Sequence, residues 1–477
     1  MLELENLDKL HEECGVIGAY LNDADADAAK FIYYGLYALQ HRGQESAGIA
    51  SNLNGKITPI KSPGLVSEVF RNHHELEKLK GNIAIGHVRY STMGGSDPRS
   101  AQPLAASYKQ GDIALAHNGN LVNGESIKEM LTDAGIIFQT TSDSEAILNL
   151  ICQNASAHGI EQGIKTAMDL MKGAYVLVIT TQDKLIGVRD PYGLHPLCLG
   201  KLQNNSGYIL ASESCALDAL DAEFIRDIQP GEIVIIDSQG VKTIEPSLWR
   251  GKKLCVFELV YFARPDSIVD GVSVYDFRRQ CGALLANQNK IQADLVMAAP
   301  DSGIPAAIGY AEASGIPYGE GLIKNKYIGR TFIQPTQEMR EDAVKIKLSP
   351  IRHNINGKRL ILIDDSIVRG TTCRRIVRML KNAGASEVHV CIASPAVKYS
   401  CYFGIDTPYR ENLIAVQKTE SEILEYLEAD SLTYLSPENL FKACECRDLY
   451  CKACFNGDYP MEVPASAKPS SFAKEGR

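Results

Sequence analysis

Short apolar runs with many β-branched residues recur through the first half of the chain, and most end at glycine or Asp-Gly-type turns. Runs of this length and composition predict strands. The predicted strands cover 14–20, 46–50, 82–89, 112–116, 174–179, 207–211 and 232–236. Helices are expected over 28–40, 144–154 and 160–171, and Ser142-Asp143-Ser144-Glu145 supplies a capping sequence for the second. This pattern predicts stacked sheets with helices on the outside, an α+β arrangement.

The pattern changes after a charged, aperiodic join over 246–253. Continuous apolar runs at 294–299, 359–363 and 387–393 then alternate with longer helical stretches, which is typical of an α/β domain with a parallel sheet covered on both faces. Ligands of such sheets bind at the carboxyl ends of the strands. The chain is therefore expected to contain a first domain over 14–245, a second over 254–464 and a polar tail over 465–477.

Composition and charge exclude several classes of function. The 477 residues carry 49 Lys and Arg against 58 Asp and Glu, a net charge of −9, so no nucleic-acid partner is expected. No apolar stretch approaches the roughly 18 residues of a membrane-spanning helix. Residues 1–13 are acidic and unlike a secretory signal, which indicates a cytoplasmic location. In that reducing compartment the 13 cysteines are expected to be packing residues, metal ligands or nucleophiles.

The most informative segment follows the second of the late apolar runs. Two adjacent carboxylates, Asp364 and Asp365, precede a short loop rich in hydroxyls and glycine, and a helix is expected from about Thr372. Backbone N–H groups at the helix start, with the hydroxyls of Ser366, Thr371 and Thr372, form a cup for a phosphate monoester. The carboxylates suit the hydroxyls of a sugar beside it. An ordinary capped strand-to-helix turn is the alternative.

This segment resembles the phosphoribosylpyrophosphate motif of type I phosphoribosyltransferases. The resemblance implies that Asp364 and Asp365 bind the ribose hydroxyls and Mg²⁺, a hard ion suited to carboxylates and pyrophosphate. It assigns the 5′-phosphate to the loop and helix start, namely Ser366, Arg369, Gly370, Thr371 and Thr372.

Two upstream segments complete the predicted phosphoribosylpyrophosphate site. Asp301 and Ser302 lie in a tight loop that would present N–H groups to pyrophosphate, with Ser302 also a Mg²⁺ ligand, unless this is a plain turn. Lys324 and Arg330 lie in a basic, aromatic segment that resembles the flexible loop closing over the sugar in type I enzymes. A solvated basic surface is the alternative for that segment.

Cys14 is a candidate nucleophile at the start of the first predicted strand. If residues 1–13 are a propeptide, their removal gives Cys14 a free α-amine, whose pKa near 8 suits a general base for its own thiol. A buried internal cysteine is the commoner case, so the proposal depends on the surrounding motifs.

Those motifs lie at 41–45, 86–92, 116–120 and 142–145. With the Cys-Gly start they resemble the class II glutamine amidotransferase domain, an N-terminal-nucleophile hydrolase with four αββα layers. The resemblance assigns Asn118 and the Gly119 N–H to the tetrahedral oxyanion. Arg89 suits the α-carboxylate of glutamine and Asp143 its α-ammonium.

Four further side chains in these motifs have secondary roles. Arg42 and Thr92 would support the binding of glutamine, and His87 and His117 are expected to be structural, because an α-amine base needs no imidazole.

Cysteines with metal-ligand spacing end the second domain. Cys451 and Cys454 form a C-x-x-C pair, which supplies only two ligands. Over nearly its whole length the chain resembles the glutamine phosphoribosylpyrophosphate amidotransferase family, in the subgroup with a 4Fe–4S cluster and a propeptide. That resemblance implies the ligands Cys255, Cys401, Cys451 and Cys454. Nearby Cys444 and Cys446 leave the choice at the C-terminal end open, and a Zn²⁺ site is the alternative.

The resemblance implies an enzyme with two linked activities. The first domain would make ammonia from glutamine, and the second would use it to displace pyrophosphate from phosphoribosylpyrophosphate, giving 5-phosphoribosylamine for purine synthesis. Purine nucleotides are expected to inhibit, and a homotetramer or other homo-oligomer is expected. The alternatives are another class II amidotransferase, which should lack Asp364-Asp365, and a phosphoribosylpyrophosphate-sensing regulator, which has no use for Cys14.

Overall fold

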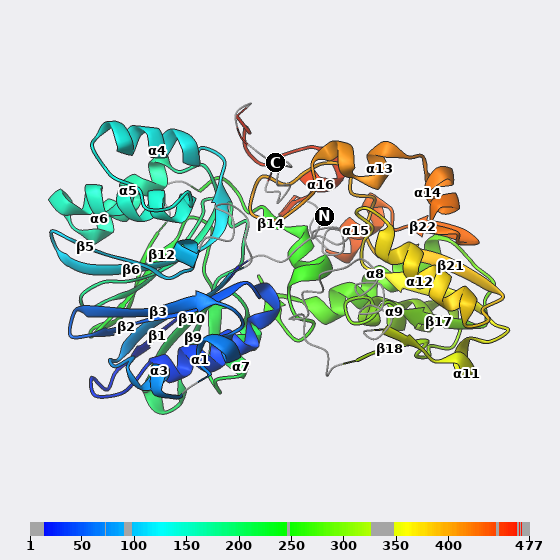
Figure 1. The fold of residues 1–477 in the computed structure, drawn as a ribbon, viewed down its shortest axis with the longest axis horizontal. Coiled ribbons are helices and arrows are strands. Elements are labelled where there is room, and N and C mark those ends of the chain that lie inside the picture. Colours follow the sequence, from blue (N-terminus) through cyan, green and yellow to red (C-terminus); the bar gives the residue numbers. More distant parts are fainter. Residues whose placement is uncertain are drawn as a thin grey trace.

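The computed structural model describes residues 14–71, 73–89, 98–245, 249–325, 348–444 and 448–464, together with 467 and 469. The described chain forms two lobes, with the segments around β14 and α16 lying between them (Figure 1). Two of the expectations above, the propeptide over 1–13 and most of the tail over 465–477, lie outside the described residues.

Two antiparallel sheets stack in the first lobe. The seven-stranded sheet has the order β11 (Glu223–Asp227), β9 (Cys198–Lys201), β10 (Gly207–Ala211), β1 (Gly15–Leu21), β4 (Ile83–Arg89), β2 (Ser46–Leu53) and β3 (Lys56–Pro63). The six-stranded sheet has the order β13 (Gly240–Ile244), β12 (Ile233–Asp237), β8 (Leu185–Arg189), β7 (Gly173–Thr180), β6 (Gly111–Leu121) and β5 (Leu104–Tyr108).

Helices cover the outer faces of both sheets (Figure 1). On the seven-stranded sheet lie α1 (Ala29–Ala38), α2 (Val66–Val69), α3 (His73–Glu77) and α7 (Ser214–Asp218), and on the six-stranded sheet lie α4 (Gly124–Asp133), α5 (Asp143–His158) and α6 (Ile160–Leu170). Strand β1 is buried on both sides because Val16 and Tyr20 face the second sheet while Ile17 and Ala19 face α1. The four αββα layers are those that the sequence predicts.

A parallel sheet forms the second lobe. Its order is β17 (Leu295–Ala298), β20 (Arg359–Asp364), β21 (Glu387–Ile392) and β22 (Ser431–Tyr434). Alternate residues of its strands pack on α8 (Val274–Gln288) and α9 (Ile304–Ser314) on one face, and on α12 (Thr371–Asn382) and α14 (Glu420–Leu427) on the other. The smaller elements are β15 (Ile268–Val269), β16 (Val272–Ser273), β18 (Leu322–Lys324), β19 (Leu348–Pro350), α11 (Arg352–Ile355), α13 (Ile414–Gln417) and α15 (Pro437–Ala443).

Segments far apart in sequence meet between the lobes. Strand β14 (Leu254–Cys255) pairs in parallel with β23 (Tyr450–Cys451), and α16 (Ala453–Asn456) follows directly. Phe403 packs with Val122, Ala174 and Leu194 of the first lobe. None of the described helices is long and apolar enough to cross a membrane.

The predicted strands and helices occur in the structure, with ends shifted by a few residues. Strand β6, for example, extends to Leu121, and α5 extends to His158. In the first lobe the expectations did not include β8 and β9, which are short and buried, nor β3, β5, β11 and β13, whose residues are largely polar or exposed. Edge strands of this kind lack the apolar run on which a strand prediction depends.

Candidate active sites

Cys14 and Arg89 lie together at one end of the seven-stranded sheet. In β1 and β4, Gly15 pairs with Val88, and the antiparallel register continues to place Cys14 opposite Arg89. Both residues are buried, at 7% and 6% exposure. Side chains alternate along a strand, so Cys14 lies on the same side as Val16, which faces the six-stranded sheet.

Asn118 and Gly119 approach the same end from the six-stranded sheet. Alternation along β6 places Asn118 on the side of Ala116, which packs between the sheets. His87 in β4 lies 3.0 Å from the carbonyl oxygen of His117, which shows how closely the two strands meet there. The Nδ2 amide of Asn118 is buried and has no hydrogen-bond partner among the described residues. A buried unpaired donor is unfavourable unless a ligand accepts from it.

Asp143 is held at the first turn of α5, beside the end of β6. Ser142 caps this helix by accepting a hydrogen bond from Ser144 N at 3.2 Å, as its sequence predicts. The Asp143 Oδ2 atom accepts from Leu121 N at 3.0 Å. The first turn of a helix favours a carboxylate, and this one is 9% exposed.

Two histidines near this site are buried and uncharged. Burial lowers the pKa of His87 to about 3, and it also lowers the pKa of His117. The ring of His117 makes a 3.0 Å contact with Ser144 Oγ. Both residues are therefore suited to packing and hydrogen bonding rather than to carrying a charge at neutral pH. Thr92, predicted to support glutamine binding, lies outside the described residues.

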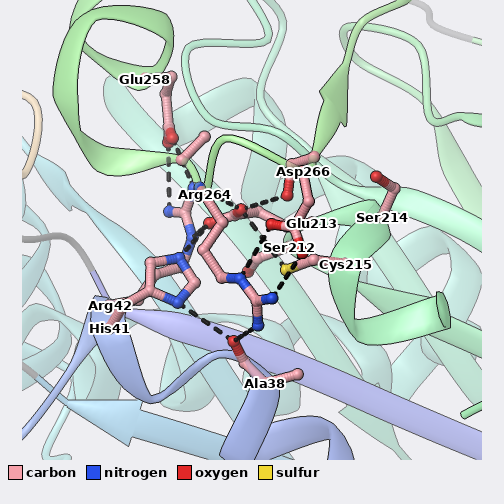
Figure 2. Close-up of polar contacts among 12 residues, drawn as sticks. Ala38, His41, Arg42, Ser212, Glu213, Ser214, Cys215, Glu258, Arg264 and Asp266 are labelled. Carbon is pink, nitrogen blue, oxygen red and sulfur yellow. Dashed lines mark hydrogen bonds and ion pairs between the residues drawn. The ribbon is translucent and has the colours of Figure 1, made fainter. Parts of the chain in front are cut away.

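Arg42 lies at the centre of a buried ion network between the two lobes (Figure 2). Its guanidinium donates to Glu213 of the first lobe and to Glu258 of the second, and all three side chains are fully buried. Glu213 also accepts from His41 at 2.7 Å and from Ser267 at 2.6 Å. Burial acts to raise the pKa of Glu213, but the neighbouring charges and hydrogen bonds hold it well below its usual range. Arg42 thus joins the lobes beside the site.

Asp364 and Asp365 end β20 at the carboxyl edge of the parallel sheet. Because β17 and β20 are neighbouring parallel strands, the loop after β17 lies beside them. Ser302 Oγ donates to Asp365 Oδ2 at 2.5 Å, and Ser366 Oγ donates to Asp365 Oδ1 at 2.6 Å. The structure therefore brings together two predicted acids and the two hydroxyls predicted to act with them.

The predicted phosphate cup is a helix start. Gly370 has φ +81°, a left-handed conformation that favours glycine, and α12 begins at Thr371. Helix N-termini present N–H groups to anions. Lys324 in β18 lies 2.5 Å from Asp301, so these two predicted residues also meet beside the sheet edge. Arg330 lies outside the described residues.

Arg278 lies near Asp365 and was not predicted as a site residue. It lines a small cavity with Ser302 and Asp365, and its guanidinium donates to the carbonyl oxygens of Leu259 and Ala263, both at 2.8 Å. Burial lowers the pKa of Arg278 to about 10, against the opposing charge of Asp365. The available signal was an arginine on the same helix face as Phe277, Cys281 and Leu285.

The four predicted cluster ligands surround one cavity between the lobes. Cys255 and Cys451 pair in the parallel strands β14 and β23, and Cys401 and Cys454 line the same cavity. Three aromatic side chains, Phe257, Phe403 and Tyr459, complete its apolar wall. Among the described residues, no group of three His, Cys, Asp or Glu side chains is arranged to hold a metal ion.

Backbone N–H groups point toward these sulfurs. Phe403 N lies 3.3 Å from Cys401 Sγ. Burial raises the pKa values of Cys451, to about 11, and of Cys454, while backbone hydrogen bonds act to lower both. Cys444 does not line the cavity and packs in the core of the second lobe, near Cys281. Cys446 lies outside the described residues.

Comparison with known proteins agrees with both halves of this description. A family model of a glutamine amidotransferase domain matches residues 87–219, and one of a phosphoribosyl transferase domain matches 276–400. The amidophosphoribosyltransferase of Synechocystis sp. is 49% identical over 473 residues, covering 98% of this chain and 95% of that protein. That of Bacillus subtilis is 47% identical over 466 residues, covering 96% of each.

Solved structures match the whole fold as well. The glutamine phosphoribosylpyrophosphate amidotransferase from B. subtilis, complexed with ADP and GMP, has a TM-score of 0.89 at 45% identity and covers 96% of this chain and 99% of that one. A structure described as the allosteric regulatory enzyme of purine biosynthesis has a TM-score of 0.90 at 46% identity, covering 96% and 98%.

The fold and the two sites define a class II glutamine amidotransferase joined to a phosphoribosyltransferase. With relatives this similar over nearly the full chain, the protein belongs to the amidophosphoribosyltransferase family. It is a glutamine-dependent enzyme that transfers the amide nitrogen to phosphoribosylpyrophosphate, giving 5-phosphoribosylamine for purine biosynthesis. A regulator without catalysis and another kind of class II amidotransferase are thereby excluded.

Proposed function

We propose that Cys14, freed of residues 1–13, is the nucleophile of the glutaminase site and that its own α-amine is the base. The thiolate attacks the glutamine amide carbon, the tetrahedral intermediate loses ammonia, and water hydrolyses the resulting thioester. Asn118 Nδ2 and Gly119 N–H stabilise the oxyanion, while Arg89 and Asp143 hold the two charged ends of the amino acid. The buried, unpartnered Asn118 amide is the observation that best supports this assignment.

Separate assays with glutamine and with ammonia test these roles. Asn118→Ala should lower glutamine-dependent synthesis about 10²-fold through kcat, because one oxyanion donor is lost. Synthesis from added ammonia should stay near the wild-type rate, since the second domain is untouched. The intact mass should show a chain that begins at Cys14. An Asn118→Ala variant with normal glutaminase activity, or a mature chain beginning at Met1, would contradict the proposal.

In the second domain we propose that the predicted residues bind phosphoribosylpyrophosphate. The α12 start, with Ser366, Thr371 and Thr372, would hold the 5′-phosphate. Asp364, Asp365 and Ser302 offer hard oxygen atoms that fit Mg²⁺, which when bound would neutralise pyrophosphate charge. The closing loop with Arg330 would exclude water. An Asp365→Asn variant should raise the KM for phosphoribosylpyrophosphate and its Mg²⁺ requirement without changing glutamine hydrolysis.

We further propose that the cysteine cavity holds a 4Fe–4S cluster. Four thiols around an apolar cavity, with N–H groups aimed at their sulfurs, fit a cluster better than one Zn²⁺ ion. When bound, the cluster would link the start of the second domain to its two late segments. Cys451→Ala should lose iron and sulfide, whereas Cys281→Ala, a buried cysteine outside the cavity, should keep both. Equal iron contents in the two variants would overturn this assignment.

Purine nucleotides are proposed to inhibit at the phosphoribosylpyrophosphate site. A ribose-phosphate cup also fits a nucleoside monophosphate, and the B. subtilis structure is a complex with ADP and GMP. Millimolar AMP and GMP should raise the apparent KM for phosphoribosylpyrophosphate. Unchanged kinetics at those concentrations would contradict it.

The enzyme is also proposed to work in the cytoplasm as a homotetramer or other homo-oligomer. Thiol chemistry and an iron–sulfur cluster suit a reducing compartment. Light scattering on the anaerobically purified protein measures the assembly, and a monomer at micromolar concentration would contradict it.

A further inference from the structure

We propose that the loop Cys401–Gly404 of the second lobe is a positioning element for the oxyanion strand of the glutaminase site. The inference rests on the proposed oxyanion role of Asn118 and Gly119. It adds Asn120 and Gly404, as positioning residues, to the glutaminase residues proposed above.

Gly404 lies so close to the backbone of Gly119 that a side chain on it would crowd that residue. A Cβ added to Gly404 would lie 3.2 Å from Gly119 Cα and 3.3 Å from its carbonyl carbon. Gly404 also has φ +117°, which side chains rarely adopt. The second lobe therefore presents bare backbone to the oxyanion residue, and any larger residue would push it.

Gly119 is confined on its other side by β7. A Cβ on Gly119 would lie 2.1 Å from the carbonyl oxygen of Ala174. With Ala174 on one side and Gly404 on the other, the peptide plane of Gly119 has little freedom to rotate. The direction of its N–H group is therefore set partly by a residue of the other lobe.

Two hydrogen bonds hold the loop against the first lobe. Asn120 Nδ2 donates to the carbonyl oxygen of Tyr402 at 2.9 Å. His195 Nε2 lies 2.7 Å from the carbonyl oxygen of Phe403, and since a carbonyl only accepts, Nε2 carries the proton. Asn120 follows Gly119 directly, so the first of these bonds anchors the oxyanion strand itself.

An oxyanion donor must be aimed at the place where charge develops, and small displacements weaken it. Movement of the loop should consequently reduce kcat for glutamine hydrolysis more than glutamine binding, because Arg89 lies on β4, in the other sheet. The predicted phosphoribosylpyrophosphate residues lie on other elements, at the end of β20 and the start of α12, so ammonia-dependent synthesis should be unaffected.

The test measures three quantities for the Gly404→Ala full-length enzyme: glutaminase kcat and KM, ammonia-dependent synthesis, and iron content. We expect kcat to fall about 10- to 100-fold. Glutamine KM, ammonia-dependent synthesis and iron content should each stay within twofold of wild type. Gly271→Ala is the matched control, since Gly271 has φ +83° and no atom within 4 Å of an added Cβ. It should leave all three unchanged.

A second variant removes one bond without adding volume. Asn120→Ser cannot reach Tyr402 O and should lower glutaminase kcat about 3- to 30-fold, again without loss of ammonia-dependent synthesis. Wild-type glutaminase kcat in both Gly404→Ala and Asn120→Ser would overturn the inference, and so would an equal loss in Gly271→Ala. Loss of all activities together would show general damage and also overturn it. Asn118→Ala separates the proposals: if it alone impairs kcat, the oxyanion assignment holds and the positioning role fails.

Discussion

At the scale of single residues, two buried carboxyl groups have pKa values shifted in opposite directions. Glu213 is fully buried but paired with Arg42, which keeps its pKa low. Asp227 in β11 is largely buried beside Asp270. Burial, and to a smaller extent repulsion from the Asp270 carboxylate, raises the pKa of Asp227 to about 6. The folded state therefore binds the Asp227 proton more tightly than the unfolded state does, and stability falls as pH rises from about 4 to 6.

Replacement of Asp227 should relieve this penalty. Asp227→Asn should raise the free energy of unfolding by about 1–2 kcal/mol at pH 8, where the wild-type carboxylate is charged. Near pH 4 the two proteins should be equally stable because the folded carboxyl is then protonated. Thermal unfolding at both pH values measures the difference, and an Asp227→Asn protein less stable than wild type at pH 8 would refute the explanation.

At the scale of elements, the cap of α5 has both a structural and a functional effect. Ser142→Ala removes the side-chain acceptor and should destabilise the protein by about 1 kcal/mol. Because Asp143 begins that helix, glutamine KM should also rise. Thr419→Ala removes the equivalent cap of α14, where Thr419 accepts from Glu422 N, and serves as the control. Thr419→Ala should lower stability by a similar amount with no change in glutamine KM. If glutamine KM is the same in both variants, the α5 cap has no effect on substrate binding.

Local signals explain which elements could be predicted. Asp364-Asp365 and the helix after it follow one apolar strand, so strand, loop and phosphate cup are readable from a single stretch. Short apolar, β-branched runs predict stacked sheets with outer helices, and the family resemblance implies the four αββα layers. Edge strand β3 (Lys56–Pro63) was not predicted because five of its eight residues are exposed, so the segment has no apolar run. Arg278 was missed because its partners are backbone carbonyls that only the folded chain brings together.

At the scale of the whole molecule, the lobes are joined by buried charge as well as by packing. Arg42 connects Glu213 and Glu258, and Arg189 of the first lobe pairs with Asp270 of the second at 2.8 Å. No pattern in the sequence marks such pairs, since the partners are far apart along the chain. The motif around Arg42 predicts a place near glutamine but not its part in this network.

Arg42 should be among the least replaceable residues for stability. Arg42→Met leaves two buried carboxylates without their cation and should destabilise the folded protein by about 3–5 kcal/mol. The triple variant Arg42→Met, Glu213→Gln, Glu258→Gln removes the uncompensated charges and should recover part of that loss. Urea unfolding of the three proteins measures this. A triple variant less stable than Arg42→Met would contradict the electrostatic explanation.

The hydrogen bond from Asn120 to Tyr402 spans 282 residues of sequence, so Tyr402 is synthesised only after the whole first domain. A nascent first domain folds before the loop that steadies its oxyanion strand has been synthesised. On the proposed positioning role, such a partial chain hydrolyses glutamine poorly. Ammonia release is therefore delayed until the domain that consumes it has been made, and an unfinished chain wastes little glutamine.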